Sequence, residues 1–133
     1  MYKLLLVDDE EIIRTGVTEM IDWEAMGITL TAACENALAA LESMTDELPD
    51  ILMTDVRMPG MDGISATRAM TQRFPTVKVL VLTTYDEDDY AFGALEVGAS
   101  GFLLKDVRAA QLAQAVRAVA QGDAVLTPRV TKE

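Results

Sequence analysis

Histidine is absent from this chain of 133 residues, and cysteine occurs only once, at Cys34. Without histidine the protein cannot hold zinc through imidazole, assemble a Ser-His-Asp triad or donate phosphate from a phosphohistidine. A single cysteine cannot form a disulfide within the chain. Any chemistry must therefore be done by carboxylates, hydroxyls and amines.

Basic residues are scarce as well, with 11 Lys and Arg against 22 Asp and Glu and a formal net charge of −11. Nucleic-acid affinity depends largely on clustered Lys and Arg, so we expect this chain alone not to bind DNA. No apolar run approaches the roughly 18 to 20 residues of a membrane span, and the N-terminal segment turns acidic at Asp8, too early for a signal peptide. We therefore expect a cytoplasmic protein without membrane contact.

The chain does contain an alternation of short apolar runs with segments of helical period, repeated five times. Alternation of this kind is typical of βαβ units, and nearly continuous apolar strands indicate burial on both faces. The sequence therefore predicts an α/β fold in which helices cover both sides of a parallel sheet. The expected strands cover residues 4–7, 28–34, 51–53, 77–82 and 101–104. The expected helices cover about residues 13–21, 37–44, 64–74, 87–97 and 109–121.

Two of the expected helices have residues at the spacing of one buried face. In the last helix this face consists of Leu112, Val116 and Val119, whereas residues 123–133 beyond it show no periodicity and are predicted to be a linker stub. The buried face of the first helix is predicted to consist of Ile13, Gly16, Val17, Met20 and Ile21.

Polar residues follow the expected strands where each one ends. Asp8 and Asp9 come after the first strand, Asp55 after the third, Thr83 after the fourth and Lys105 after the fifth. Each could singly be a helix cap, a turn residue or a solvated charge. Because the carboxyl ends of parallel strands share one edge of the sheet, where ligands bind, we expect these side chains to form one site.

Carboxylates crowded at one edge repel one another unless a hard cation neutralises them, and Mg²⁺ prefers such oxygen ligands. A carboxylate beside Mg²⁺ and Lys can attack a phosphoryl group and form an aspartyl phosphate. Asp55 is the best candidate for this nucleophile. It ends a central strand and precedes a loop that Pro59 stiffens and Gly63 closes.

The polar residues stand in five longer motifs, namely Val7-Asp8-Asp9-Glu10, residues 54–63 (TDVRMPGMDG), Val81-Leu82-Thr83, residues 98–102 (GASGF) and Leu104-Lys105. With these motifs the sequence closely resembles, over about residues 2–122, the receiver domain of two-component response regulators. The resemblance implies a doubly wound, flavodoxin-like sheet of five parallel strands in the order 2-1-3-4-5. It also implies a receiver domain over residues 1–122, with 123–133 leading toward an effector domain that is not in this chain.

The same resemblance implies how the polar residues act. Asp55 would accept phosphate from the phosphohistidine of a sensor histidine kinase, without the protein being a turnover enzyme. Asp9 and Asp55 would hold Mg²⁺ together with the backbone carbonyl of Arg57, and Asp8 would reach the metal through water. Thr83 and Lys105 would bind the phosphoryl oxygens.

Phe102 falls at the position of the family's switch aromatic and lacks the hydroxyl that many members carry there. We expect Thr83 to move toward the phosphoryl group and Phe102 to turn inward, so that phosphorylation changes a surface and favours a homodimer. A second departure is Lys105-Asp106 in place of the family's Lys-Pro. A trans peptide is expected there, or a cis one at several kcal/mol of strain, because cis bonds are costly without proline.

Different segments of the sequence resemble different types of response regulator. Ile21-Asp22-Trp23-Glu24 resembles regulators with an AraC-type effector, whereas residues 83–88, 98–106 and 116–123 resemble the nitrate-response type with a LuxR-type DNA-binding effector. The second set adjoins the linker, which favours a transcription regulator of that type, whose full-length form would bind DNA.

Three alternatives remain. A stand-alone receiver would act through protein contacts alone and would need no linker. A phosphatase of the haloacid-dehalogenase type requires a second Asp two positions after the nucleophile, where this chain has Arg57. A nucleotide-binding Rossmann domain wants a Gly-rich loop after the first strand, which this sequence lacks.

Overall fold

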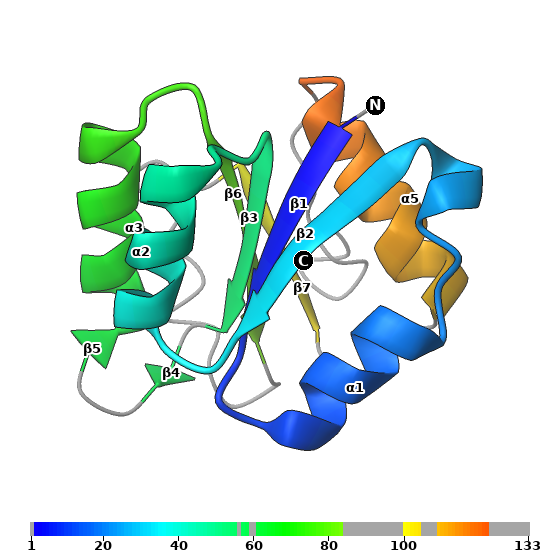
Figure 1. The fold of residues 1–133 in the computed structure, drawn as a ribbon, viewed down its shortest axis with the longest axis horizontal. Helices are drawn as coiled ribbons and strands as arrows, with labels where there is room; N and C mark the ends of the chain where they lie inside the picture. Colours follow the sequence, from blue (N-terminus) through cyan, green and yellow to red (C-terminus); the bar gives the residue numbers. More distant parts are fainter. Residues whose placement is uncertain (1, 56, 59–60, 84–99, 105–108, 123–133) are drawn as a thin grey trace, which may run out of the picture.

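A central parallel sheet organises the chain in a computed structural model, which describes residues 2–55, 57–58, 61–83, 100–104 and 109–122 (Figure 1). Of residues 37, 57–58, 61–67, 83 and 104 only the backbone is described. The five strands pair in the order β2-β1-β3-β6-β7, and every pairing among them is parallel. The predicted order 2-1-3-4-5 is therefore confirmed. The strands are β1 (Tyr2–Val7), β2 (Ile28–Cys34), β3 (Ile51–Asp55), β6 (Lys78–Thr83) and β7 (Gly101–Leu104).

Helices cover both faces of this sheet, as the doubly wound prediction requires. In Figure 1, α2 and α3 lie on one side of the strands, and α1 and α5 lie on the other. A short 3₁₀ helix, η1, precedes β2 and was not predicted. The bounds are α1 (Glu11–Glu19), η1 (Glu24–Met26), α2 (Ala37–Asp46), α3 (Gly63–Arg73) and α5 (Ala109–Ala120).

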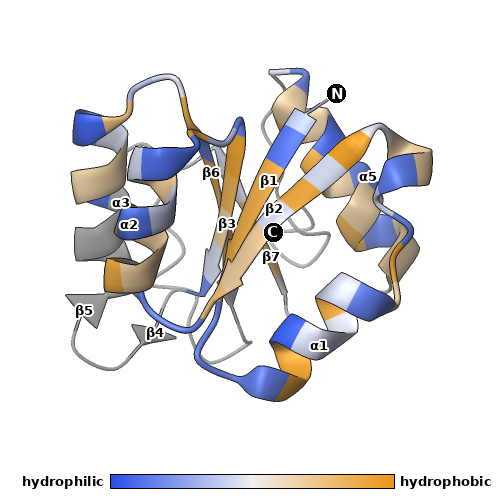
Figure 2. Cartoon of the chain, in the orientation of Figure 1, coloured by the Kyte–Doolittle hydropathy of each residue, from blue (hydrophilic) through white to orange (hydrophobic). Residues whose placement is uncertain are grey.

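The core has two layers because successive side chains of a strand point to opposite faces. Leu5 and Val7 of β1 pack in the cluster beneath α2 and α3, whereas Leu4 and Leu6 pack in the cluster beneath α1 and α5. Figure 2 shows the central strands as mainly hydrophobic along their length. Burial on both faces thus explains the nearly continuous apolar runs in the sequence.

The predicted faces of the first and last helices can be compared with the observed burial. Leu112, Val116 and Val119 of α5 are buried as predicted. Val17 and Ile21 are buried as well, but the prediction for Met20 is wrong, because its side chain is 77% exposed. Met20 is the C-cap of α1, one position beyond the last helical residue, Glu19.

Residues 56–63, which were expected to form a loop, contain a small antiparallel pair. Its strands are β4 (Arg57–Met58) and β5 (Met61–Asp62), which lie at the lower edge of the molecule in Figure 1. The helix predicted over residues 87–97, the Lys105-Asp106 peptide and the linker stub 123–133 lie outside the described residues. Within the part of the chain that the structure describes, none of the helices is both long and apolar enough to span a bilayer.

Candidate functional site

The carboxyl ends of the five strands lie together at the lower edge of the sheet in Figure 1. Asp8 follows β1 directly, and Asp55 is the last residue of the central strand β3. In the pairing of β3 with β6, Asp55 lies opposite Leu82, which brings the backbone of Thr83 to the same edge. The expected convergence is confirmed for these strands, whereas Lys105 lies outside the described residues.

Four carboxylates gather at this edge: those of Asp8, Asp9, Glu10 and Asp55. One oxygen from each lies within 4.8 Å of the corresponding oxygen of every other. Asp8 and Asp55 are 0% and 3% exposed, whereas Asp9 and Glu10 are exposed to solvent. We call these four residues the acidic cluster. Two of its carboxylates are thus buried and the other two are accessible to solvent.

Hydrogen bonds hold the loop between β1 and α1 in place beneath this cluster. The backbone N–H of Asp8 donates to the carbonyl of Cys34 at the end of β2, at 3.0 Å. The Asp8 Oδ1 accepts the backbone N–H of Glu10 at 2.9 Å. The guanidinium Nη1 of Arg14, in α1, donates to the Asp8 carbonyl at 2.7 Å. Both the backbone and the side chain of Asp8 are thus tied to neighbouring elements.

The donor set of the acidic cluster suits a hard divalent cation. Its ligand atoms are all carboxylate oxygens, which Mg²⁺ prefers and usually takes one or two at a time. Two of the four carboxylates are buried, and burying a charge is costly unless an opposite charge accompanies it. The residues at this edge therefore fit Mg²⁺. Arg57, whose backbone carbonyl is the further ligand expected from the resemblance, begins β4 two positions after Asp55.

Phe102, the predicted switch aromatic, lies in β7 opposite Val81 of β6. Its ring is 1% exposed and belongs to the core cluster beneath α2 and α3. The conformation in the structure is thus the inward one, which the sequence analysis expected after phosphorylation. Thr83 is described only by its backbone, so the expected movement of its side chain toward a phosphoryl group stays a prediction.

Two members of this site were not assigned a role from the sequence, namely Glu10 and Arg14. Glu10 stood inside the Val7-Asp8-Asp9-Glu10 motif but was given no function. The sequence feature that could have placed Arg14 near the site was its position four residues after Glu10, since residues four apart share one face of a helix. The contact of Arg14 with the Asp8 carbonyl depends on how the loop folds back, which spacing alone does not indicate.

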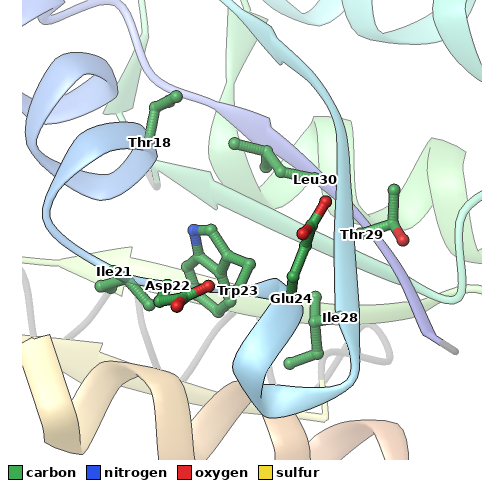
Figure 3. Close-up of a pocket in the computed structure, with 8 residues that line it drawn as sticks. All are labelled: Thr18, Ile21, Asp22, Trp23, Glu24, Ile28, Thr29 and Leu30. Atoms are coloured by element: carbon green, nitrogen blue, oxygen red, sulfur yellow. The ribbon is translucent and has the colours of Figure 1, made fainter.

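A separate pocket of about 340 Å³ lies where α1, η1 and the beginning of β2 meet (Figure 3). The indole Nε1 of Trp23 donates to the carbonyl of Val17 at 2.9 Å, which ties η1 to α1. Because the lining residues of β2 are at its amino end, the pocket is remote from the acidic cluster and its chemistry. It is lined by Thr18, Ile21, Asp22, Trp23, Glu24, Ile28, Thr29 and Leu30.

The sheet order, the flanking helices and the acidic edge together define a class of signalling domain. The chain belongs to the response regulator receiver domain family, whose pattern it matches over residues 4–117. This match confirms the resemblance and favours the receiver over the phosphatase alternative.

Relatives point to the same regulator type. The chain is 39% identical over 129 residues to the transcriptional regulatory protein DegU of Brevibacillus brevis, covering 97% of this chain and 54% of that protein. It is 36% identical over 131 residues to the oxygen regulatory protein NreC of Staphylococcus carnosus, covering 97% and 59%. The chain thus spans roughly three fifths of the length of these relatives.

Among solved structures, a LuxR-family two-component response regulator from Aurantimonas sp. SI85-9A1 superposes with a TM-score of 0.90. The two sequences are 32% identical, and the match covers 100% of this chain and 94% of that chain. The predicted receiver domain of the nitrate-response and LuxR type is therefore confirmed.

Proposed function

We propose that this receiver domain takes a phosphoryl group onto the carboxylate of Asp55 in a reaction that requires Mg²⁺. The observation that carries the proposal is the acidic cluster, in which Asp55 ends the central strand beside three further carboxylates. Its side chain is buried, so its surroundings fix the direction from which a donor can approach. Asp9 and Asp55 would hold the metal with the carbonyl of Arg57, and Asp8 would reach it through water.

The chain's own groups have separate tasks in this reaction. An Asp55 oxygen attacks phosphorus, the bond from phosphorus to the donor's nitrogen breaks, and the electron pair leaves with the donor imidazole. Mg²⁺, when bound, supplies positive charge that offsets the charge of the phosphoryl oxygens. Lys105 and Thr83 would hold two of those oxygens. The chain is itself modified once per event, so it acts as a phosphoacceptor and not as a turnover enzyme.

The donor and the output follow from the family. Receiver domains interact with histidine kinases, and we propose a sensor histidine kinase as the donor here. We further propose that phosphorylation favours a homodimer and that residues 123–133 lead to a DNA-binding effector in the full-length protein. The relatives named as transcriptional regulators, and the share of their length that this chain spans, support that reading. A cytoplasmic location agrees with these partners.

Intact mass spectrometry tests the phosphoacceptor assignment. The chain is incubated with a small acyl phosphate or phosphoramidate and Mg²⁺, and we expect the gain of one phosphoryl group. Asp55→Asn and added chelator should each abolish the gain. Asp46→Asn, a matched change at an exposed position at the end of α2, should leave it intact. A gain that persists in Asp55→Asn would refute the assignment.

A further inference from the structure

Arg14 is a cation placed against the backbone of the acidic cluster. It lies in α1 and is half-buried, and its own N–H donates to the carbonyl of Glu10, which anchors it in the first turns of the helix. Its guanidinium Nη1 reaches back across six positions to the carbonyl oxygen of Asp8, at 2.7 Å. A hydrogen bond of this length from a charged donor is among the stronger ones in proteins.

The carbonyl that Arg14 holds belongs to the peptide unit between Asp8 and Asp9. A peptide unit is planar, so fixing its oxygen fixes the plane that contains the Cα atoms of both residues. The side chains of Asp8 and Asp9 leave from those two atoms. Arg14 therefore restrains the direction of two carboxylates through one contact with the main chain.

Two further hydrogen bonds of this loop act on either side of that peptide unit. The N–H of Asp8 is bonded to Cys34, and the Asp8 Oδ1 is bonded to the N–H of Glu10. These contacts hold the start of the loop and the start of the helix. Without the guanidinium, the intervening peptide plane would lose this hydrogen bond and would be held less firmly between its two ends.

We propose that Arg14 is a positioning residue for the cation site, acting by holding the peptide unit from which Asp8 and Asp9 project. The inference rests on the proposed function, because it takes the acidic cluster to be the Mg²⁺ site. Positioning by Arg14 should strengthen Mg²⁺ binding. Its charge should weaken Mg²⁺ binding, since a fixed positive charge close to the cluster repels a dication. The two effects predict opposite signs when Arg14 is replaced, and this difference makes the proposal testable.

Calorimetric titration of Mg²⁺ into the full chain measures the sign directly. Arg14→Met keeps an apolar stem and removes both the charge and the donor, and we expect it to weaken Mg²⁺ binding on the order of tenfold. Arg14→Lys keeps a charged donor and should restore much of the affinity. Arg117→Met, an equal loss of charge at an exposed position in α5, is the matched control and should bind Mg²⁺ like the native chain.

Hydrogen exchange gives a second readout that needs no metal. The N–H of Glu10 is bonded to Asp8 Oδ1, so its exchange reports whether the loop keeps its shape. We expect faster exchange of this amide in Arg14→Met and unchanged exchange of the amides in β3. If Arg14→Met proves unfolded, Arg14→Gln, which has a polar head on a shorter stem, is expected to show the same two changes.

The outcomes distinguish the proposed function from the role of Arg14. Failure of the native chain to bind Mg²⁺ would overturn the proposed function. Native binding together with equal or tighter binding by Arg14→Met would overturn only the role of Arg14, since its charge would then be the larger effect. Weaker binding by Arg14→Met, partial recovery in Arg14→Lys and faster exchange at Glu10 would establish the positioning role.

Discussion

Replacing Asp8 by asparagine should stabilise this domain when no metal is present. The Asp8 carboxylate is 0% exposed and has an oxygen within 4.8 Å of oxygens from three other carboxylates. Two unit charges at that separation repel by about 3 kcal/mol at an effective dielectric constant of about 20, and by about 1 kcal/mol in water. Asparagine has nearly the same shape, and its Oδ1 can still accept the N–H of Glu10.

The expected gain in the free energy of unfolding is therefore about 1 to 3 kcal/mol in the presence of chelator. The two ends of that range correspond to one neighbouring carboxylate at the effective dielectric constants of water and of a protein surface. With saturating Mg²⁺ the gain should shrink or change sign, because bound Mg²⁺ offsets the charge of the carboxylates and the variant binds Mg²⁺ less well.

Denaturant unfolding followed by the fluorescence of the single tryptophan, Trp23, measures this difference, because the indole is buried in the native state. Asp46→Asn, at an exposed position, serves as the control and should change the unfolding free energy by less than about 0.5 kcal/mol. Loss of stability in Asp8→Asn under chelator would refute the reasoning. It would mean that contacts of the Asp8 carboxylate outweigh the repulsion within the acidic cluster.

Two other substitutions and one binding assay test separate parts of the account. Asn36 caps α2 by accepting the N–H of Ala39 at 2.8 Å, so Asn36→Ala should lower the unfolding free energy by about 1 kcal/mol in a denaturant titration. Trp23→Phe removes the donor to Val17 and should cost about 1 to 3 kcal/mol, measured by circular dichroism; an unchanged midpoint would show that the bond is dispensable. With its net charge of −11, this chain should give no gel shift with duplex DNA even at low salt, and a shift that salt abolishes would contradict the assignment of DNA binding to another domain.

The strands were the part of the fold that could be predicted most closely, and the reason is burial. The ranges 28–34 and 101–104 agree with β2 and β7 to the residue. The apolar run of the third strand stops at Met53, whereas β3 continues through Thr54 to Asp55, and both of these polar residues are buried. Hydropathy indicates a strand only while its side chains are apolar, so the hydropathy signal stops at the first polar residue of the site although the strand continues.

Features that depend on tertiary contacts were missed or wrong. Met20 kept helical spacing in the sequence, yet at the C-cap of α1 its side chain is exposed to solvent. The β4–β5 pair lies in a segment rich in Pro and Gly, which composition describes only as a loop. The location of Asp8, Asp9 and Asp55 at one edge could be predicted, because strand ends converge in any parallel sheet. The bond from Arg14 could not, because it depends on the path of one short loop.

Asp55 is the residue that we propose to accept the phosphoryl group, at an acidic site that depends on Mg²⁺. The most direct measurement is to phosphorylate the chain with a small donor, reduce the acyl phosphate with borohydride and locate the reduced residue by peptide mass spectrometry. We predict reduction at position 55 alone, only in samples that contained Mg²⁺. Reduction at Asp8 or Asp9 instead, or equal labelling in the presence of chelator, would contradict the claim.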